Sequence, residues 1–552
     1  MPFTLRFWRL PMVALLCAAC LQGVFPATAH ADEFKDKAAA AEKRRDWLEA
    51  CRWYDKELRK DRNQPDVRDA YQRCLRRLYL VRRGEDHVYR EAVAKLKPEQ
   101  ALDVYLQVLA AVRAAYVDSS RTDLNSLLQQ GVQELQFDFE EDVFVQEYFA
   151  GAKPAQIDKF KKALADWRTH TVKDEKDVRA EVLEMDATAR RCGLDVKPAL
   201  QVAIRLELSA GACNALDEYT LFLTPGYYTD VQAMAQGKFV SIGVDLGSTA
   251  DGQVEVLRVY PKSPAEDARL MPGDRILAVN HQGDLTPDQA ADKLRGEAGS
   301  MVEIVVQSPM TMPGQPILPR TVKLMRQPVF VPSVMEPLVY NVTTEMGAVL
   351  SVGYIQINHF QDSTVQDVKE ALARLQTAGV QALILDLRGN PGGSFKAGLQ
   401  VAELFLDEGV IVYSESPLAD YNRPYKVESR NPVTLPIVVL VDRDTASAAE
   451  VVAGALQEHR SINTRIVGQT TFGKGSIQGV IPLDKKPLEN MPGGIRITIA
   501  KLFSPGKHQP YTDRGVTPDI LVNQEGAAVR DAGLDAVVQL LRNGAMNGMK
   551  MN

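Results

Sequence analysis

The chain has 552 residues, of which 45% are hydrophobic and 25% are charged, a balance typical of globular proteins. One hydrophobic core rarely organises a chain of this length, so about three or four domains are expected. The formal net charge of −6 argues against nucleic acid as the main partner, because surfaces that bind nucleic acid are rich in Lys and Arg.

The first thirty or so residues have the features of a secretory signal peptide. Two arginines precede a mostly apolar run from Leu10 to Val24, and Ala29 and Ala31 supply small residues where a signal peptidase reads them. We expect cleavage after Ala31 and export to the periplasm or another extracytoplasmic compartment. An uncleaved anchor and lipidation of Cys20 are the alternatives.

Residues 32–227 are predicted to be mostly helical, and we divide them into the helical regions 32–115 and 116–227. Spacings of four, three and four place apolar side chains on one helical face in the first region, namely Trp47, Cys51, Tyr54 and Leu58. The break at Asn63-Gln64-Pro65 should end that helix. This stretch weakly resembles a tetratricopeptide-type repeat, but a plain helical hairpin is favoured because too few units are visible.

Four cysteines remain after the predicted signal peptide: Cys51, Cys74, Cys192 and Cys213. In an oxidising compartment they can pair in three ways, and buried thiols are the alternative. Cys51 and Cys74 lie twelve and eleven residues from Asn63, so two antiparallel helices would hold them at similar height. We therefore predict a disulfide between Cys51 and Cys74.

The predicted secondary structure changes twice in the rest of the chain. Short β-rich runs separated by Gly and Pro turns occupy residues 228–328, with one helix predicted at 287–294. Strand and helix signals alternate over residues 335–525, as in an α/β core with crossover connections, and residues 526–552 carry a last helix and a tail. The predicted fold class is therefore multidomain α+β.

Ser447 follows an apolar strand and a short polar turn in I-V-V-L-V-D-R-D-T-A-S-A-A-E, at the start of a small-residue helix. Unpaired backbone N–H groups and the positive end of the helix dipole gather there, which favours negative charge that develops nearby. A plain helix N-cap is the alternative explanation for this serine.

Two glycine-containing segments are candidates for the rest of a catalytic site. Lys474 lies between two glycines after the apolar strand R-I-V-G, where loss of hydration would lower its pKa and allow it to act as a base. Gly392 and Gly393 follow a strand end, and bare backbone amides there could approach a substrate carbonyl. A solvated lysine and an ordinary Asn-Pro-Gly turn are the alternatives.

In three segments the chain resembles the carboxy-terminal processing, or tail-specific, serine proteases. The segments are D-L-R-G-N-P-G-G at 386–393, T-A-S-A-A-E at 445–450 and T-F-G-K-G-S-I-Q at 471–478, and they occur in the family's order downstream of F-L-T-P. The resemblance covers about residues 200–525. It implies a crotonase-like core and an endopeptidase that cuts proteins at or near their C-termini through an acyl-enzyme, without a cofactor.

The resemblance also implies roles for seven residues: Ser447 as nucleophile, Lys474 as general base, Gln478 orienting that lysine, the amides of Gly393 and Ala448 as oxyanion hole, and Glu450 and Thr471 as supporting residues. The loop Q-E-H-R-S-I-N-T-R between the two dyad segments is about two residues longer than the family's. We expect a surface bulge there.

Residues 228–328 resemble a PDZ domain. The segment S-I-G-V-D-L at 241–246 matches the family's carboxylate-binding loop, so Ile242, Gly243 and Val244 are the predicted peptide-binding residues. Such a module binds an extended C-terminal peptide by β-augmentation. Protein substrates with apolar or unstructured C-termini are therefore the expected partners.

Two other functions compete with a peptidase. A binding protein that has lost catalysis is disfavoured, because all the motif residues are present. An S-x-x-K serine enzyme is disfavoured because Pro505-Gly506 would force a turn inside the match at 504–507. No H-E-x-x-H motif occurs, so no metal is expected. An adaptor bound by the N-terminal helices and a homo-oligomer are left open.

Overall fold

The computed structural model describes residues 33–249, 251–296, 298–309, 318–428, 431–459, 463–483, 493–522 and 531–544. The predicted signal peptide, its cleavage after Ala31 and the lipidation alternative at Cys20 lie outside these residues. The chain divides into two compact units, residues 1–74 and 75–552. No helix in these described stretches has both the length and the apolar character needed to cross a lipid bilayer.

The first unit is helical, as predicted. It contains α1 (Glu33–Lys43), α2 (Trp47–Lys60) and the first half of α3 (Pro65–Glu85). Helix α2 begins after Asp46, whose carboxylate accepts the Glu49 N–H and satisfies an amide that the first turn leaves unpaired. It buries Cys51, Tyr54 and Leu58, three of the four residues on the predicted face.

The predicted disulfide between Cys51 and Cys74 is wrong, because the structure contains no such bond and both side chains are buried as thiols. Helix α2 packs mainly along α1 rather than along α3. The Cys74 side chain acts electrostatically on Tyr54. Tyr54 follows Cys51 by three residues on α2, which is about one helical turn. Equal distance from a break was therefore not enough to predict a disulfide.

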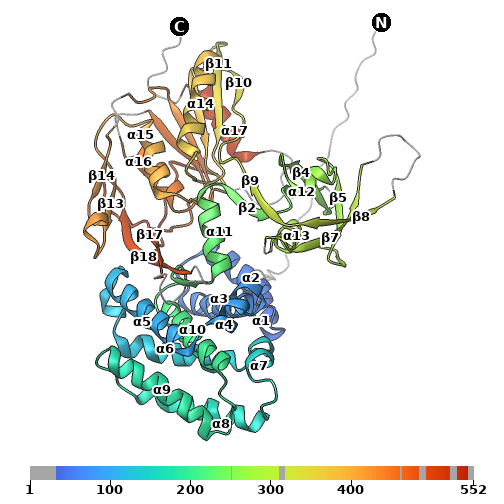
Figure 1. The fold of residues 1–552 in the computed structure, drawn as a ribbon. Coiled ribbons are helices and arrows are strands. Elements are labelled where there is room, and N and C mark those ends of the chain that lie inside the picture. Colours follow the sequence, from blue (N-terminus) through green and yellow to red (C-terminus); the bar gives the residue numbers. More distant parts are fainter. Residues whose placement is uncertain are drawn as a thin grey trace, which may run out of the picture. The chain divides into compact units, whose positions relative to one another are not determined.

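The second unit begins with a helical region (Figure 1). After α3 come α4 (His87–Lys95), α5 (Pro98–Ala115), α6 (Leu124–Asp138), α7 (Asp142–Tyr148), α8 (Pro154–Leu164), α9 (Glu175–Arg191), α10 (Pro198–Asn214) and α11 (Pro225–Ala235). Helix α10 packs against both α5 and α6 and is buried almost throughout its length. It is the central helix of this region. A short strand, β1 (Leu221–Leu223), follows it.

The β-rich region contains two sheets. Strand β2 (Lys238–Ser241) pairs with β9 (Gln327–Phe330), and the larger sheet has the order β3-β4-β5-β7-β8, with β6 beside β5. Its elements are β3 (Val244–Ser248), β4 (Val254–Val259), α12 (Pro264–Asp267), β5 (Arg275–Val279), β6 (Gln282–Gly283), α13 (Pro287–Leu294), β7 (Met301–Gln307) and β8 (Arg320–Met325). Helix α13 has the predicted bounds and packs against the edge strand β3.

The last region contains a mostly parallel sheet of order β10-β11-β12-β15-β16-β19. Only β10 and β11 pair antiparallel in it. Its strands are β10 (Leu338–Thr343), β11 (Val349–Gln356), β12 (Ala382–Asp386), β15 (Ile437–Val441), β16 (Thr464–Gly468) and β19 (Ile520–Leu521). The helices are α14 (Thr364–Thr377), α15 (Phe395–Glu403), α16 (Ala448–Glu458) and α17 (Ala532–Arg542).

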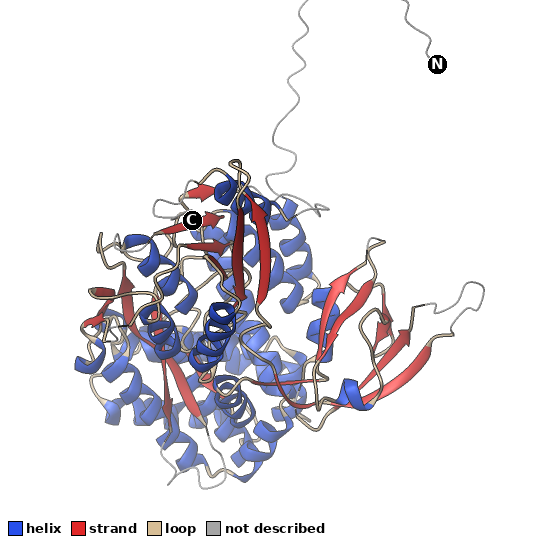
Figure 2. Cartoon of the chain, turned by 90° about the horizontal axis from the view of Figure 1, so that it is seen from above, coloured by secondary structure: helices blue, strands red, loops and turns tan. Residues whose placement is uncertain are grey.

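Both faces of the parallel sheet are covered. On β12, Leu383 and Leu385 face the core that includes α14, α15 and α16, whereas Ala382 and Ile384 face α17. Burial on both faces explains why this strand is a continuous apolar run, and each fully buried leucine contributes about 1.5–3 kcal/mol. Figure 2 shows this mixture of helices and strands. The α+β class predicted from the sequence is confirmed.

A second sheet is antiparallel and has the order β1-β18-β13-β14, with β17 also paired to β18. Its strands are β13 (Val410–Glu415), β14 (Pro424–Lys426), β17 (Ser476–Pro482) and β18 (Gly494–Phe503), together with β1. The pairing of β1 with β18 brings a segment of the helical region into this sheet. As a result, residues that precede the PDZ-like region lie beside the segment that carries Lys474.

Candidate active site

Ser447 lies between the fully buried strand β15 and helix α16, as the sequence predicts. Its φ of 57° and ψ of −117° are not the extended values of an ordinary N-cap, and holding a non-glycine residue there costs about 1–3 kcal/mol. Its side chain makes no capping hydrogen bond. Ser447 is thus the N-cap residue of α16 in an unusual backbone conformation, and Glu450 in the first turn accepts its N–H.

The glycine pair after β12 lies directly against the Ser447 turn. A Cβ on Gly392 would lie 2.7 Å from the Cβ of Ser447, and one on Gly393 would lie 2.1 Å from the Phe360 carbonyl oxygen. Both residues also have φ above +90°, so no larger residue fits. In the described chain, neither the Gly393 N–H nor the Ala448 N–H has a hydrogen-bond partner. Two unpaired donors beside the serine are what an oxyanion hole requires.

Two buried side chains hold this arrangement. Asn390 donates to the Ile357 carbonyl and accepts the Gly392 N–H, both at 2.8 Å. The Thr445 hydroxyl donates to the Leu387 carbonyl at 2.8 Å. The Thr445 bond, together with the Ala446 N–H that donates to the Asn390 carbonyl at 2.9 Å, ties the turn after β12 to the turn before α16.

Glu450 joins the serine segment to the lysine segment. Its carboxylate is fully buried and accepts hydrogen bonds from the N–H groups of Ser447, Gly473 and Lys474 at 2.7, 2.6 and 2.8 Å. The Thr471 hydroxyl donates to it at 2.6 Å. Burial raises the pKa of Glu450, and these four donors oppose the rise. The two residues predicted to support the site thus contact each other. Of the two, Glu450 also accepts the backbone N–H groups of Ser447 and Lys474.

Lys474 is in an environment that favours its neutral form. Burial, and then the nearby Arg496 cation, lower its pKa to about 8, while Asp217, Glu450 and Glu218 act in the opposite direction. A primary amine with this pKa is neutral in about one molecule in ten at pH 7, far more often than an exposed lysine. This is the direction that a general base needs.

The side chains of the predicted dyad are not hydrogen-bonded to each other in the described chain. Lys474 Nζ lies 4.6 Å from the centroid of the Tyr219 ring. Within the described residues no hydrogen bond joins it to Ser447 Oγ or to Gln478. The Gln478 amide instead donates to Ser476 Oγ at 2.8 Å and to Thr498 Oγ1 at 3.4 Å. The structure therefore brings the predicted residues into one site but does not show Gln478 orienting the lysine.

The sequence reasoning missed three neighbours of Lys474: Asp217, Tyr219 and Arg496. The first two lie in the connection between α10 and β1, and Arg496 lies on β18. Asp217 and Tyr219 belong to the stretch L-D-E-Y-T-L, directly before F-L-T-P. Nothing local in that stretch indicates contact with a lysine more than two hundred residues later, so only the β1–β18 pairing reveals it.

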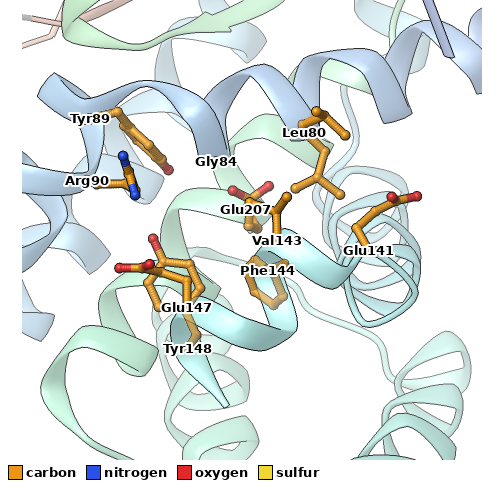
Figure 3. A pocket seen from close by; sticks show the side chains of 11 residues that line it. Leu80, Gly84, Tyr89, Arg90, Glu141, Val143, Phe144, Glu147, Tyr148 and Glu207 are labelled. Atoms are coloured by element: carbon orange, nitrogen blue, oxygen red, sulfur yellow. The ribbon is translucent and has the colours of Figure 1, made fainter. Parts of the chain in front are cut away.

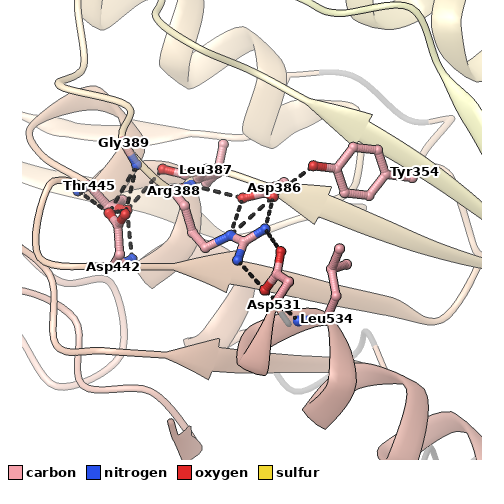
Figure 4. A network of polar contacts seen from close by, with 9 residues as sticks. All are labelled: Tyr354, Asp386, Leu387, Arg388, Gly389, Asp442, Thr445, Asp531 and Leu534. Atoms are coloured by element: carbon pink, nitrogen blue, oxygen red, sulfur yellow. Dashed lines mark hydrogen bonds and ion pairs between the residues drawn. The ribbon is translucent and has the colours of Figure 1, made fainter. Parts of the chain in front are cut away.

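Arg388 of the D-L-R segment connects the glycine loop to the C-terminal helix (Figure 4). Its guanidinium bonds both Asp386, at 2.6 Å, and Asp531, at 2.7 Å. Tyr354 donates its hydroxyl to the same Asp386 carboxylate at 2.8 Å. Asp531 is the N-cap of α17. The helix is thereby fixed to the residues that lead into Gly392 and Gly393.

The predicted peptide-binding loop lies between β2 and β3 in the PDZ-like region. Ile242 is fully buried, and the Gly243 N–H donates to the Ser241 hydroxyl at 3.0 Å. Val244 begins the edge strand β3. The loop therefore lies at the end of the edge strand β3, and β-augmentation adds a peptide to such a strand.

A pocket in the helical region is separate from this site (Figure 3). It is lined by side chains of α3, α4, α7 and α10, including the apolar Val143 and Phe144. Glu207 also lines it and forms a buried salt bridge with Arg83. None of the candidate catalytic residues lines this pocket, so it is not the candidate active site.

Comparisons with known proteins agree with these observations. Residues 351–522 match peptidase family S41, and residues 255–308 match the PDZ domain. A carboxyl-terminal-processing protease of Picosynechococcus sp. is 33% identical over 312 residues, which cover 56% of this chain and 70% of that protein. A protein of the same name from Synechocystis sp. is 32% identical over 339 residues, covering 60% and 75%.

A solved structure of a photosystem II D1 C-terminal processing protease aligns with 81% of this chain and 98% of that one. Its sequence identity is 25% and its TM-score 0.42. With the sequence relatives and the two family matches, the chain is shown to belong to peptidase family S41, as a carboxyl-terminal-processing serine protease with a PDZ domain.

Proposed function

We propose that this protein is an exported endopeptidase that cleaves proteins at or near their C-termini with a Ser447–Lys474 dyad. The observation that carries the proposal is the Glu450 carboxylate, which accepts the backbone N–H groups of both dyad residues. A buried carboxylate with donors from both segments keeps the nucleophile turn and the lysine turn together. The unpaired amides of Gly393 and Ala448 support the same role for the site.

The chemistry begins when Ser447 Oγ attacks the scissile carbonyl carbon and its proton passes to the neutral Lys474 amine. The Gly393 and Ala448 amides stabilise the negative oxygen of the tetrahedral intermediate. When the C–N bond breaks, Lys474 returns the proton to the leaving amine and an acyl-enzyme on Ser447 remains. Water then attacks the ester by the same proton route and releases the serine.

Recruitment and compartment are further parts of the proposal. The loop Ile242–Val244 would bind a free, apolar C-terminus, and residues 1–31 would direct export and then be removed. We also propose the domain division read from the sequence: helical regions 32–115 and 116–227, a PDZ domain at 228–328, a protease core at 335–525 and the segment 526–552.

Ser447→Ala tests the proposal. The variant should stay folded and lose about a thousandfold or more of its peptidase activity, because the attacking oxygen is gone. Purified full-length protein is incubated with an unfolded protein substrate, and new C-termini are identified by mass spectrometry. Ser351→Ala, on β11 and outside the site, is the matched control and should cleave at the parental rate. Equal cleavage by Ser447→Ala and its parent would contradict the dyad.

A further inference from the structure

The Lys474 amine lies over an aromatic ring. Nζ lies 4.6 Å from the centroid of the Tyr219 ring, within the distance of about 6 Å at which a ring face attracts a cation. No hydrogen bond to Ser447 competes with this contact among the described residues. The observed position of the lysine is therefore one that a protonated amine favours.

Tyr219 is fixed by its backbone on both sides. Its N–H donates to the Asp217 carboxylate at 3.0 Å, and its carbonyl accepts the Arg496 Nε at 3.0 Å. The Asp217 carboxylate also accepts the Tyr116 hydroxyl, at 3.2 Å, and Leu221 pairs with Arg496 where β1 meets β18. The backbone that carries the ring is therefore anchored to β18 and, through Asp217, to the residue that follows α5.

The charges around Lys474 do not provide an alternative anchor. Arg496 repels the ammonium, whereas Asp217, Glu450 and Glu218 attract it. The carboxylates of Glu450 and Asp217 already accept hydrogen bonds from other groups. No hydrogen bond from Nζ to any of the three acids occurs in the described chain. Contact with the ring face therefore stabilises the protonated amine more than the neutral one.

We propose that Tyr219 is a positioning residue that holds the protonated Lys474 away from Ser447, and that only the neutral amine leaves the ring to accept the serine proton. The proposal rests on the proposed role of Lys474 as base. It makes the connection between α10 and β1 a part of the protease that sets the pH at which the dyad assembles.

The test is the pH dependence of kcat/KM for Tyr219→Leu and Tyr219→Phe in the full-length protein. Leucine keeps an apolar side chain but removes the ring face, so the ammonium loses its stabilisation. The midpoint of the acidic limb should then fall by about half to one pH unit. Phenylalanine keeps the ring face, so the acidic midpoint of the Tyr219→Phe variant should equal that of the parent. A merely structural role would lower kcat/KM at every pH without moving the midpoint.

Tyr219→Met provides a second apolar replacement if the leucine variant does not fold, and Tyr148→Leu on α7 controls for the loss of a tyrosine in the helical region. A midpoint that stays in place or rises in Tyr219→Leu and Tyr219→Met overturns the proposal. Activity of Lys474→Arg is measured in parallel. If Lys474→Arg were active, the proposed base would be wrong. If Lys474→Arg is inactive but the pH midpoint of kcat/KM in Tyr219→Leu equals that of the parent, only the proposed role of the ring is overturned.

Discussion

Glu450 and Lys474 show how single buried groups organise this site. A carboxylate in a low-dielectric position is costly unless donors surround it, and Glu450 has four, from Ser447, Thr471, Gly473 and Lys474. The same burial that makes those bonds strong also lowers the pKa of Lys474. One local environment therefore fixes the backbones of Ser447 and Lys474 and lowers the pKa of the proposed base.

The first residue-scale prediction concerns the protonation of Lys474. With a pKa of about 8, the amine is mostly protonated and inactive below that pH. The value of kcat/KM should therefore rise about tenfold per pH unit up to pH ~8 and then level off. Lys474→Arg should be inactive throughout, because a guanidinium does not deprotonate. Lys501→Arg, an exposed position on β18, is the matched control. An activity that is flat with pH would exclude an amine as the base.

At the scale of elements, α17 braces the loop that carries the glycine pair. Its N-cap residue Asp531 binds Arg388, which is bonded to Asp386 at the end of β12. The apolar side chains of Val537 and Leu541 on this helix cover one face of the parallel sheet. A helix that follows the protease motifs in sequence is therefore part of the support for the proposed oxyanion hole.

Asp531→Asn tests this support. Removing the charge should cost about 1 kcal/mol in the free energy of unfolding at neutral pH and lower kcat several-fold by loosening the loop. Burial raises the pKa of Asp531 and the Arg388 hydrogen bonds lower it, with a net value below its ordinary range. The stability difference from the parent should therefore be complete above pH ~4 and vanish as the pH falls through the folded-state pKa.

Denaturant unfolding at several pH values measures that difference, with Asp535→Asn on the exposed side of α17 as the control. A stability difference that persists unchanged in strong acid would show that the Arg388–Asp531 pair is not its source.

At the scale of the whole molecule, the protease core is completed by a region far from it in sequence. Strand β1 pairs with β18, and the Val117 N–H donates to the Thr498 carbonyl at 2.9 Å. One hydrophobic core includes residues of both the helical region from Leu80 onward and the protease core. We therefore expect the helical region that begins near residue 75 to be required for an assembled active site.

A further prediction concerns peptide binding by the PDZ domain. Full-length protein carrying Ser447→Ala should bind peptides with a free, apolar C-terminus, because the carboxylate can accept backbone N–H groups of the loop at residues 242–244. Amidating that terminus removes the charge and should weaken binding at least about tenfold. Fluorescence anisotropy measures both affinities, and acetylating the peptide's N-terminus is the control. Equal affinity for the amidated peptide would refute the assignment of the loop.

Local patterns in the sequence determined most of the elements. The helix expected at 448–458 and the buried strands within A-L-I-L-D-L-R and P-I-V-V-L-V-D are present, because periodicity and small polar turns act over a few residues. The order of three short motifs likewise predicted the family, which the comparisons confirm.

Only the tertiary structure decided what surrounds the lysine and which predicted partners meet. The contact of Tyr219 with Lys474, the hydrogen bonds of Gln478 to Ser476 and Thr498, and the absence of a Cys51–Cys74 disulfide all depend on packing between distant segments. Strand pairing and side-chain packing select such contacts from many that the local sequence permits equally. The sequence by itself therefore determined the family, whereas the fold decided where the side chain of the proposed base lies.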